Sequence, residues 1–189
     1  MRLMVTAIEF VNTVGGRTHA TPVRYVVDRE RMLTIDDLLE WAVKLGVVAR
    51  RPRAKPGFLK RALQFREALY RIFKSMIDGR RPDAADLELL NRELAKARAH
   101  ERLTIHGDHA AVVDDDRDSL EHLLRVIARS AADLLTSEQL SRVKLCGGES
   151  CGWLFLDTTR NRTRRWCDMR DCGNIAKVRR FRERRRGRT

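Results

Sequence analysis

The sequence lacks any long hydrophobic run, and this absence is the first constraint on the class of protein. No apolar stretch approaches the roughly 20 residues that a membrane-spanning helix requires. Acidic Glu9 interrupts the apolar residues near the start of the chain, so a secretory signal is not expected either. Together these absences predict a cytoplasmic protein without a membrane partner.

Motifs for covalent or phosphate chemistry are also missing. The chain has no glycine-rich phosphate-binding loop, no nucleophile elbow and no cysteine–histidine pair suited to catalysis. We therefore expect a protein that is not an enzyme. Hydrophobic residues make up 43% of the 189 positions, which is enough to bury a core and excludes a disordered polymer.

Acidic residues are scarce relative to basic ones, and the imbalance is greatest near the C-terminus. The chain has 39 Lys and Arg against 26 Asp and Glu, a formal net charge of +13. Residues 146–189 hold 13 basic and 5 acidic side chains, a net charge of +8, whereas the preceding 145 residues carry only +5. This concentration favours a polyanionic partner, DNA first and RNA second. A solubilising tail is the alternative.

Hydrophobic periodicity predicts a mainly α protein with a helical N-terminal domain and a minor β-hairpin. Thr34 and Asp37 form a capping-box pattern at the start of one helix. A connection over 16–33 should be irregular, with a short extended piece at 25–27. The expected helices cover about 3–14, 34–45, 56–78, 82–97 and 119–135, with a short turn after Ser137 and a hairpin formed by 103–105 and 110–113.

No cysteine occurs before residue 146, and all four then follow at paired spacing. The pattern C-x4-C-x15-C-x4-C comprises Cys146, Cys151, Cys167 and Cys172. Each pair can form a tight turn, and four thiolates complete the tetrahedral shell of a structural Zn2+. A disulfide framework is a poor explanation because nothing indicates export. An iron site and four free buried cysteines are the alternatives.

The residues around the cysteines predict a small hairpin followed by a helix. Trp153–Leu156 is typical of a strand, and 163–166 is expected to be its return strand. The segment 173–186 is expected to be helical, with Val178 and Phe181 turned toward the zinc module.

Basic side chains follow the predicted helix in two tracks and continue on the opposite strand. Lys177, Arg180 and Arg184 share one face, while Arg179, Arg182 and Arg186 share another. Guanidinium groups bind phosphate bidentately and read guanine edges. A solvated helix, or one that binds an acidic partner, is the alternative. The candidate nucleic-acid-binding residues are Arg160, Arg162, Arg164, Arg165, Lys177, Arg179, Arg180 and Arg184.

Several short segments resemble the CGNR zinc-finger family of bacteria. They are CGWLFLD (151–157), RNR (160–162), RRWCDM (164–169) and CGN (172–174). The segment EFVNT (9–13) is similar to the F-x-N-T segment that opens the family's helical ABATE domain. The resemblance implies an ABATE-like domain over 1–138 and a zinc finger with a basic helix over 139–189. It also implies that the four cysteines are the zinc ligands.

The family is associated with stress-induced transcription regulation, so the resemblance implies a DNA-binding zinc module behind a helical domain that senses a signal. A small-molecule effector and a homodimer are compatible with that domain. Ile175 stands where the family has Arg. This departure bears on a nucleic-acid contact from that position and leaves the metal ligands untouched.

Two functions remain open from the sequence. The first is a bacterial DNA-binding regulator whose residues 1–140 receive a signal or dimerise. The second is a non-enzymatic ligand- or protein-interaction scaffold, whose zinc is structural and whose basic tail contacts RNA or an acidic partner.

Three further groups of polar residues are weaker candidates. His100, His106 and His109 could hold a metal, or simply lie exposed on the predicted hairpin. The acidic run 114–116 could attract a cation or stabilise the start of the next helix. Asn12 could line a ligand pocket or satisfy backbone groups, and we favour the second reading.

Overall fold

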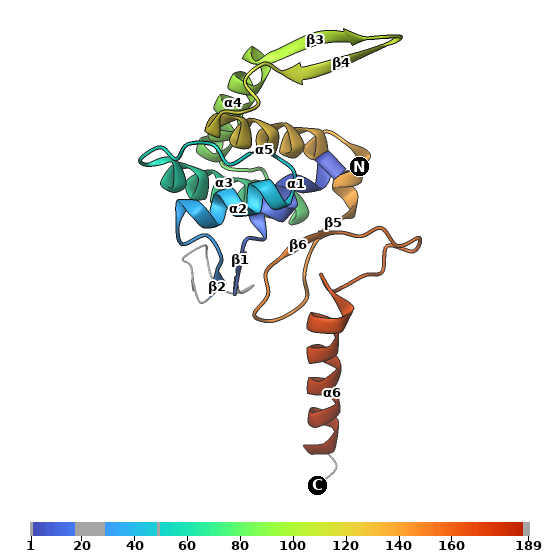
Figure 1. Cartoon of the computed structure of the whole chain (residues 1–189). Helices are drawn as coiled ribbons and strands as arrows, with labels where there is room; N and C mark the ends of the chain where they lie inside the picture. Colours follow the sequence, from blue (N-terminus) through green and yellow to red (C-terminus); the bar gives the residue numbers. More distant parts are fainter. Residues whose placement is uncertain (1, 18–28, 49, 187–189) are drawn as a thin grey trace.

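The computed structural model describes residues 2–17, 29–48 and 50–186, which form a helical body from which one helix projects (Figure 1). The extended piece expected at 25–27 lies outside these residues. The mainly α class predicted from the sequence is confirmed. The helices are α1 (Arg2–Val11), α2 (Ile35–Lys44), α3 (Phe58–Ile77), α4 (Ala84–Ala99), α5 (Leu120–Leu135) and α6 (Asn174–Arg186).

The described strands form three antiparallel pairs. One pair, β3 with β4, is the predicted hairpin, and it is longer than expected because its ladder continues to His106 opposite His109. Gly107 takes a positive φ of 61° in the two-residue turn. The pairs are β1 (Val14–Gly15) with β2 (Arg29–Glu30), β3 (Glu101–His106) with β4 (His109–Asp114), and β5 (Val143–Leu145) with β6 (Leu154–Leu156).

Side-chain caps set where several helices begin. The Thr34 hydroxyl accepts from the Asp37 backbone N–H at 3.2 Å, and the Asp37 carboxylate accepts from the Thr34 N–H at 2.7 Å, which confirms the capping box. Asp83 and Ser119 cap α4 and α5 by accepting a single hydrogen bond each, from the backbone N–H groups of Ala85 and His122. By contrast, α1 ends at Val11, three residues earlier than predicted, because the chain turns there into β1.

The core lies where α1 packs against α3 and α5, with α4 covering the other side of α3 and α5. Phe10, Leu69 and Leu123, one from each of the three inner helices, are fully buried in it. Val143 and Leu154, from β5 and β6, belong to the same buried cluster. The C-terminal hairpin is therefore built onto the hydrophobic core of the helical body.

Two expectations about the C-terminal module are wrong. Trp153–Leu156 does pair as a strand over Leu154–Leu156, but its partner is β5, upstream of it, and 163–166 is irregular. The chain after β6 instead folds around a buried carboxylate, Asp157, as described below. Val178 and Phe181 do not face the zinc module: they are 39% and 56% exposed on a helix that extends away from the body (Figure 1).

Candidate metal centre and basic surface

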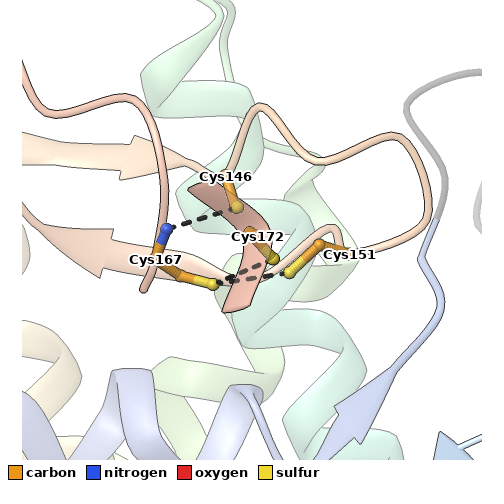
Figure 2. Close-up of side chains that lie close together, drawn as sticks. All are labelled: Cys146, Cys151, Cys167 and Cys172. Carbon is orange, nitrogen blue, oxygen red and sulfur yellow. Dashed lines mark hydrogen bonds between the residues drawn. The ribbon is translucent and has the colours of Figure 1, made fainter. Parts of the chain in front are cut away.

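Four separate pieces of backbone bring the cysteines together. Cys146 directly follows β5, and Cys151 lies shortly before β6. Cys167 follows the irregular segment, and Cys172 lies in a π-helical turn, Met169–Gly173, that leads into α6. Figure 2 shows the four side chains converging on one point. The spacing in the sequence predicted this convergence, although the connecting hairpin is a different one.

The distances between the sulfur atoms fit a tetrahedral zinc ion. All four Sγ atoms lie within 4.8 Å of one another. Cys167 Sγ is 3.6 Å from Cys151 Sγ and 3.7 Å from Cys172 Sγ. A disulfide would need about 2.05 Å, and all four thiols are free. A tetrahedron with Zn–S bonds of about 2.3 Å has edges of about 3.8 Å, close to the observed separations.

The pKa values of the four thiols also indicate that the cluster needs a cation to hold all four as thiolates. The Cys151 thiol donates a hydrogen bond that lowers the pKa of Cys146 to about 5, and the same bond raises the pKa of Cys151. Burial raises the pKa of Cys167 to about 12 and also raises that of Cys172. The protein alone therefore favours one thiolate and disfavours the other three. A divalent metal supplies the charge that lets four thiolates coexist.

Backbone and small residues complete the shell around the sulfurs. The Cys167 N–H donates to Cys146 Sγ at 3.3 Å, which orients that ligand. A Cβ at Gly148 would lie 3.1 Å from the Cys151 Cβ and 3.3 Å from the Cys172 Sγ. A side chain at position 148 would therefore press on two of the four ligands, which would have to shift slightly to make room for it.

Asp157 organises the segment between the two cysteine pairs. Its fully buried carboxylate accepts from the Lys144 ammonium at 2.7 Å and from the backbone N–H groups of Thr159 and Arg164 at 3.0 and 2.9 Å. Burial opposes ionisation, but these donors hold the pKa of Asp157 below its usual range. The ionised Asp157 side chain therefore accepts hydrogen bonds from this segment, in place of the backbone hydrogen bonds that the predicted return strand would have made with β6.

The zinc module, which is the segment from β5 to Cys172, is joined to the helical body just after the end of α1. The Asn12 side-chain amide donates to the Leu154 carbonyl at 2.8 Å, and its oxygen accepts from the Leu154 N–H at 3.0 Å. The Trp153 indole N–H donates to the Val14 carbonyl at 2.9 Å. These contacts confirm that Asn12 satisfies backbone groups. The sequence did not reveal that those groups lie 142 positions away.

A close backbone approach reinforces this junction. Gly152 has a φ of 66°, and a Cβ on it would lie 2.0 Å from the Arg17 carbonyl oxygen. Only glycine fits both the conformation and the contact.

The candidate basic residues divide into structural and exposed sets. Arg164 is structural: its guanidinium donates to the Trp166 and Cys167 carbonyls and lies 4.9 Å from the Phe155 ring centroid. Arg179 pairs with Glu149 and Glu183, so its charge is offset within the molecule. Both side chains thus have partners within the molecule, and their contact with a nucleic acid stays a prediction. The exposed set, defined as the exposed candidates that have no carboxylate partner among the described residues, comprises Arg160, Arg162, Arg165, Lys177, Arg180 and Arg184.

A groove of about 400 Å³ lies between the first cysteine turn and the start of α6. Arg165 and Arg180 line it, together with the ring of Trp166. Glu149 also lies there, and sequence reasoning missed it because an isolated acid in a basic segment carries no pattern. The groove thus places Arg165 and Arg180, two members of the exposed set, next to the first cysteine turn.

The histidine hypothesis for a second metal is not supported. The structure brings His100 together with Asp114 and Asp115, without His106 or His109. The Asp114 carboxylate is bound bidentately by the Arg125 guanidinium, with both distances 2.8 Å, which leaves it poorly suited to a cation. The acidic run 114–116 thus serves mainly to hold α5.

A helical body joined to a four-cysteine metal centre with a basic helix defines a zinc-finger protein. The family model of the ABATE domain, described as "Putative stress-induced transcription regulator", matches residues 5–138, and that of the CGNR zinc finger matches residues 142–185. The chain belongs to this ABATE and CGNR zinc-finger family. Its four clustered cysteines hold a structural zinc.

The family predicted from the sequence is therefore confirmed. No curated protein matches the chain. Among the described residues, no helix has the length and apolar character needed to cross a bilayer.

Proposed function

We propose that this protein is a cytoplasmic, bacterial DNA-binding transcription regulator without enzymatic activity, and that its response is to stress. The zinc module and α6 bind duplex DNA, and the helical body senses the stress signal. The observation that carries the proposal is the exposure of α6. It has seven basic side chains and one acidic one, and every described residue of it except half-buried Ala176 is exposed. Such a helix is an electrostatic footprint for phosphates.

The metal supports this role by fixing the helix rather than by chemistry. Four thiolates fill the coordination shell, so no position remains for a catalytic water. Cys172 lies two residues before α6 begins, so the zinc holds the start of the helix. Arg165 and Arg180 border the groove beside it, where they can contact phosphates that flank the helix.

The helical body offers a place for a small-molecule effector. A cavity of about 420 Å³ lies between α1, α5 and β4, lined by Val47, Val126 and the polar groups of His122 and Arg129. Its size is in the range of small-ligand sites. Thr6 of α1 lines the same cavity, and the end of that helix binds the zinc module through Asn12. We therefore propose that a signal at the cavity reaches the zinc module through α1 and Asn12.

The test is a salt titration of binding to random-sequence duplex DNA by the zinc-loaded full chain. With about five phosphates neutralised, the log–log slope should be about −4 to −5, so affinity falls roughly 500-fold between about 50 and about 200 mM salt. The double variant Arg180→Glu with Arg184→Glu should lose most of this binding. The control, Arg53→Glu with Lys60→Glu, makes the same change in net charge on exposed positions of the helical body.

Binding that is absent at low salt, or that the α6 variant and the control weaken equally, would overturn the proposal. Tight binding to single-stranded RNA with none to the duplex would instead favour the scaffold function.

A further inference from the structure

One face of α6 carries apolar side chains that are exposed to solvent. Asn174, Val178, Phe181 and Arg185 follow one another at intervals of four, three and four residues, which places them along a single line on a helix. We call these four residues the α6 stripe. Val178 and Phe181 are 39% and 56% exposed, and α6 extends away from the body with no other described helix or strand alongside it (Figure 1). Apolar side chains left in this position indicate a contact surface.

Basic residues flank the α6 stripe on both sides. At 100° per residue, Lys177 and Arg184 lie roughly 70–90° to one side of its centre, and Arg182 and Arg186 lie roughly 70–110° to the other. Among the described residues, neither Lys177 nor Arg182 has an ion-pair partner. The face therefore has an apolar middle between two cationic edges.

This charge pattern selects the occupant. A second copy of α6 would bring two arginine-lined helices face to face, which like charges disfavour. The major groove of duplex DNA presents the complementary pattern, because it is about 12 Å wide, admits one helix and has a phosphate wall on each side. The 13 residues of α6 are about 20 Å long, enough to lie along the groove.

The chemistry of the stripe then favours particular bases. In the major groove a thymine presents its C5-methyl group, whereas a G·C pair has no methyl group on that edge. Val178 and Phe181 can make no hydrogen bonds, so the thymine methyl group is the feature of the base edges with which they can make an apolar contact. Asn174, exposed at the start of the helix, has the amide that pairs with adenine.

We infer that α6 enters the major groove through the α6 stripe and that Val178 and Phe181 contact thymine methyl groups, giving a preference for A·T-containing sites. This inference rests on the proposed function. The two side chains are three residues apart, about 4.5 Å along the helix, so they reach neighbouring base pairs. Specificity comes from the middle of the face, and affinity from its edges.

Replacing thymine by uracil tests the inference, because it removes the methyl group and leaves base pairing intact. The zinc-loaded full chain is titrated with alternating d(A-T) and d(A-U) duplexes of equal length. Loss of one methyl contact should weaken binding about 4-fold, and loss of two about 15-fold. The variant Val178→Ser with Phe181→Ser should bind both duplexes equally, with an unchanged salt slope. It replaces only exposed side chains, so the fold should persist, as circular dichroism would verify.

A matched control replaces two other exposed apolar residues, Leu103 and Ile105 of β3, by Ser. This variant should discriminate between the duplexes as the unaltered protein does. Equal affinity of the unaltered protein for both duplexes would overturn the inference while leaving DNA binding intact. Absence of binding to either duplex would overturn the proposed function itself. If sedimentation experiments show that Phe181→Ser converts a dimer to a monomer, and the ratio of affinities for the d(A-T) and d(A-U) duplexes does not change, the α6 stripe is a self-association surface and the inference fails.

Discussion

Asn12→Ala should destabilise the whole chain although Asn12 is in neither the metal site nor the basic surface. Its side chain pairs with both backbone groups of Leu154, as a neighbouring strand would. Leu154 is 1% exposed within the main core. Truncation leaves its N–H and C=O without partners, and each such group costs about 1–3 kcal/mol. We therefore expect the free energy of unfolding to fall by about 2–6 kcal/mol in total, or roughly a 30- to 25,000-fold change in the folding equilibrium.

Urea denaturation of the zinc-loaded protein measures this effect, followed by far-UV circular dichroism for the helices and by tryptophan fluorescence. The midpoint should fall with an unchanged m-value. Zinc affinity, measured by competition with a chromophoric chelator, should fall as well, because the folded hairpin is part of the binding state. Asn91→Ala, on the exposed face of α4, is the matched control and should stay within about 0.5 kcal/mol of the unaltered protein.

The reasoning is refuted if Asn12→Ala is as stable as the control. It is also refuted if the variant unfolds in two separate steps with the helical transition unmoved, since the shared core would then not couple the two parts.

Three further predictions follow from the same contacts. Cys172→Ser should reduce zinc content from one ion per chain toward none in elemental analysis and lower the unfolding midpoint of the helices. The Arg125 guanidinium, acting against burial, holds the pKa of Asp114 below its usual value. The stabilisation by Asp114 is therefore present above about pH 4 and is lost as the pH falls further. Asp114→Ala should remove this acid dependence in urea titrations and cost about 3 kcal/mol, because buried Arg125 would retain only one carboxylate partner among the described residues, Asp116, at 3.4 Å. Gly152→Ala should destabilise far more than Gly79→Ala, because both have a φ of 66° but only position 152 faces a backbone carbonyl; equal losses would show that the junction tolerates a methyl group.

Local patterns made most of the helical body predictable. Thr34 and Asp37 lie three residues apart, so the capping box needed no knowledge of the fold. The hairpin β3–β4 is equally local, because its strands are joined by two residues. The predicted end of α1 was wrong because Asn12, just after the helix, bonds to a residue far along the chain, and no local pattern shows such a contact.

Strand pairing in the zinc module escaped prediction because it is not local. β5 has three residues, too few to show alternation, and sequence order suggested the later segment 163–166 as the partner of β6. The buried charge of Asp157 decided the outcome by gathering donors from both sides of the loop.

The metal site was predictable because thiolate spacing carries direct chemical meaning. The basic surface was only partly so. A guanidinium serves a carbonyl, a carboxylate or a phosphate equally well, and the sequence does not show which one is near. Arg164 holds backbone carbonyls and Arg179 holds two carboxylates, so neither role could be read from composition.

Because Cys172 lies next to the start of α6, the metal site is the point about which this helix would tilt. The helix extends about 20 Å from the metal site. A tilt of about 5° at the sulfur cluster would therefore move the far end of α6 by about 1.7 Å, which is about half the spacing between successive base pairs. Small adjustments in how β6 sits against α1 would thus be magnified at the tip, and a rigid tetrathiolate anchor suits such a long arm better than a flexible hinge.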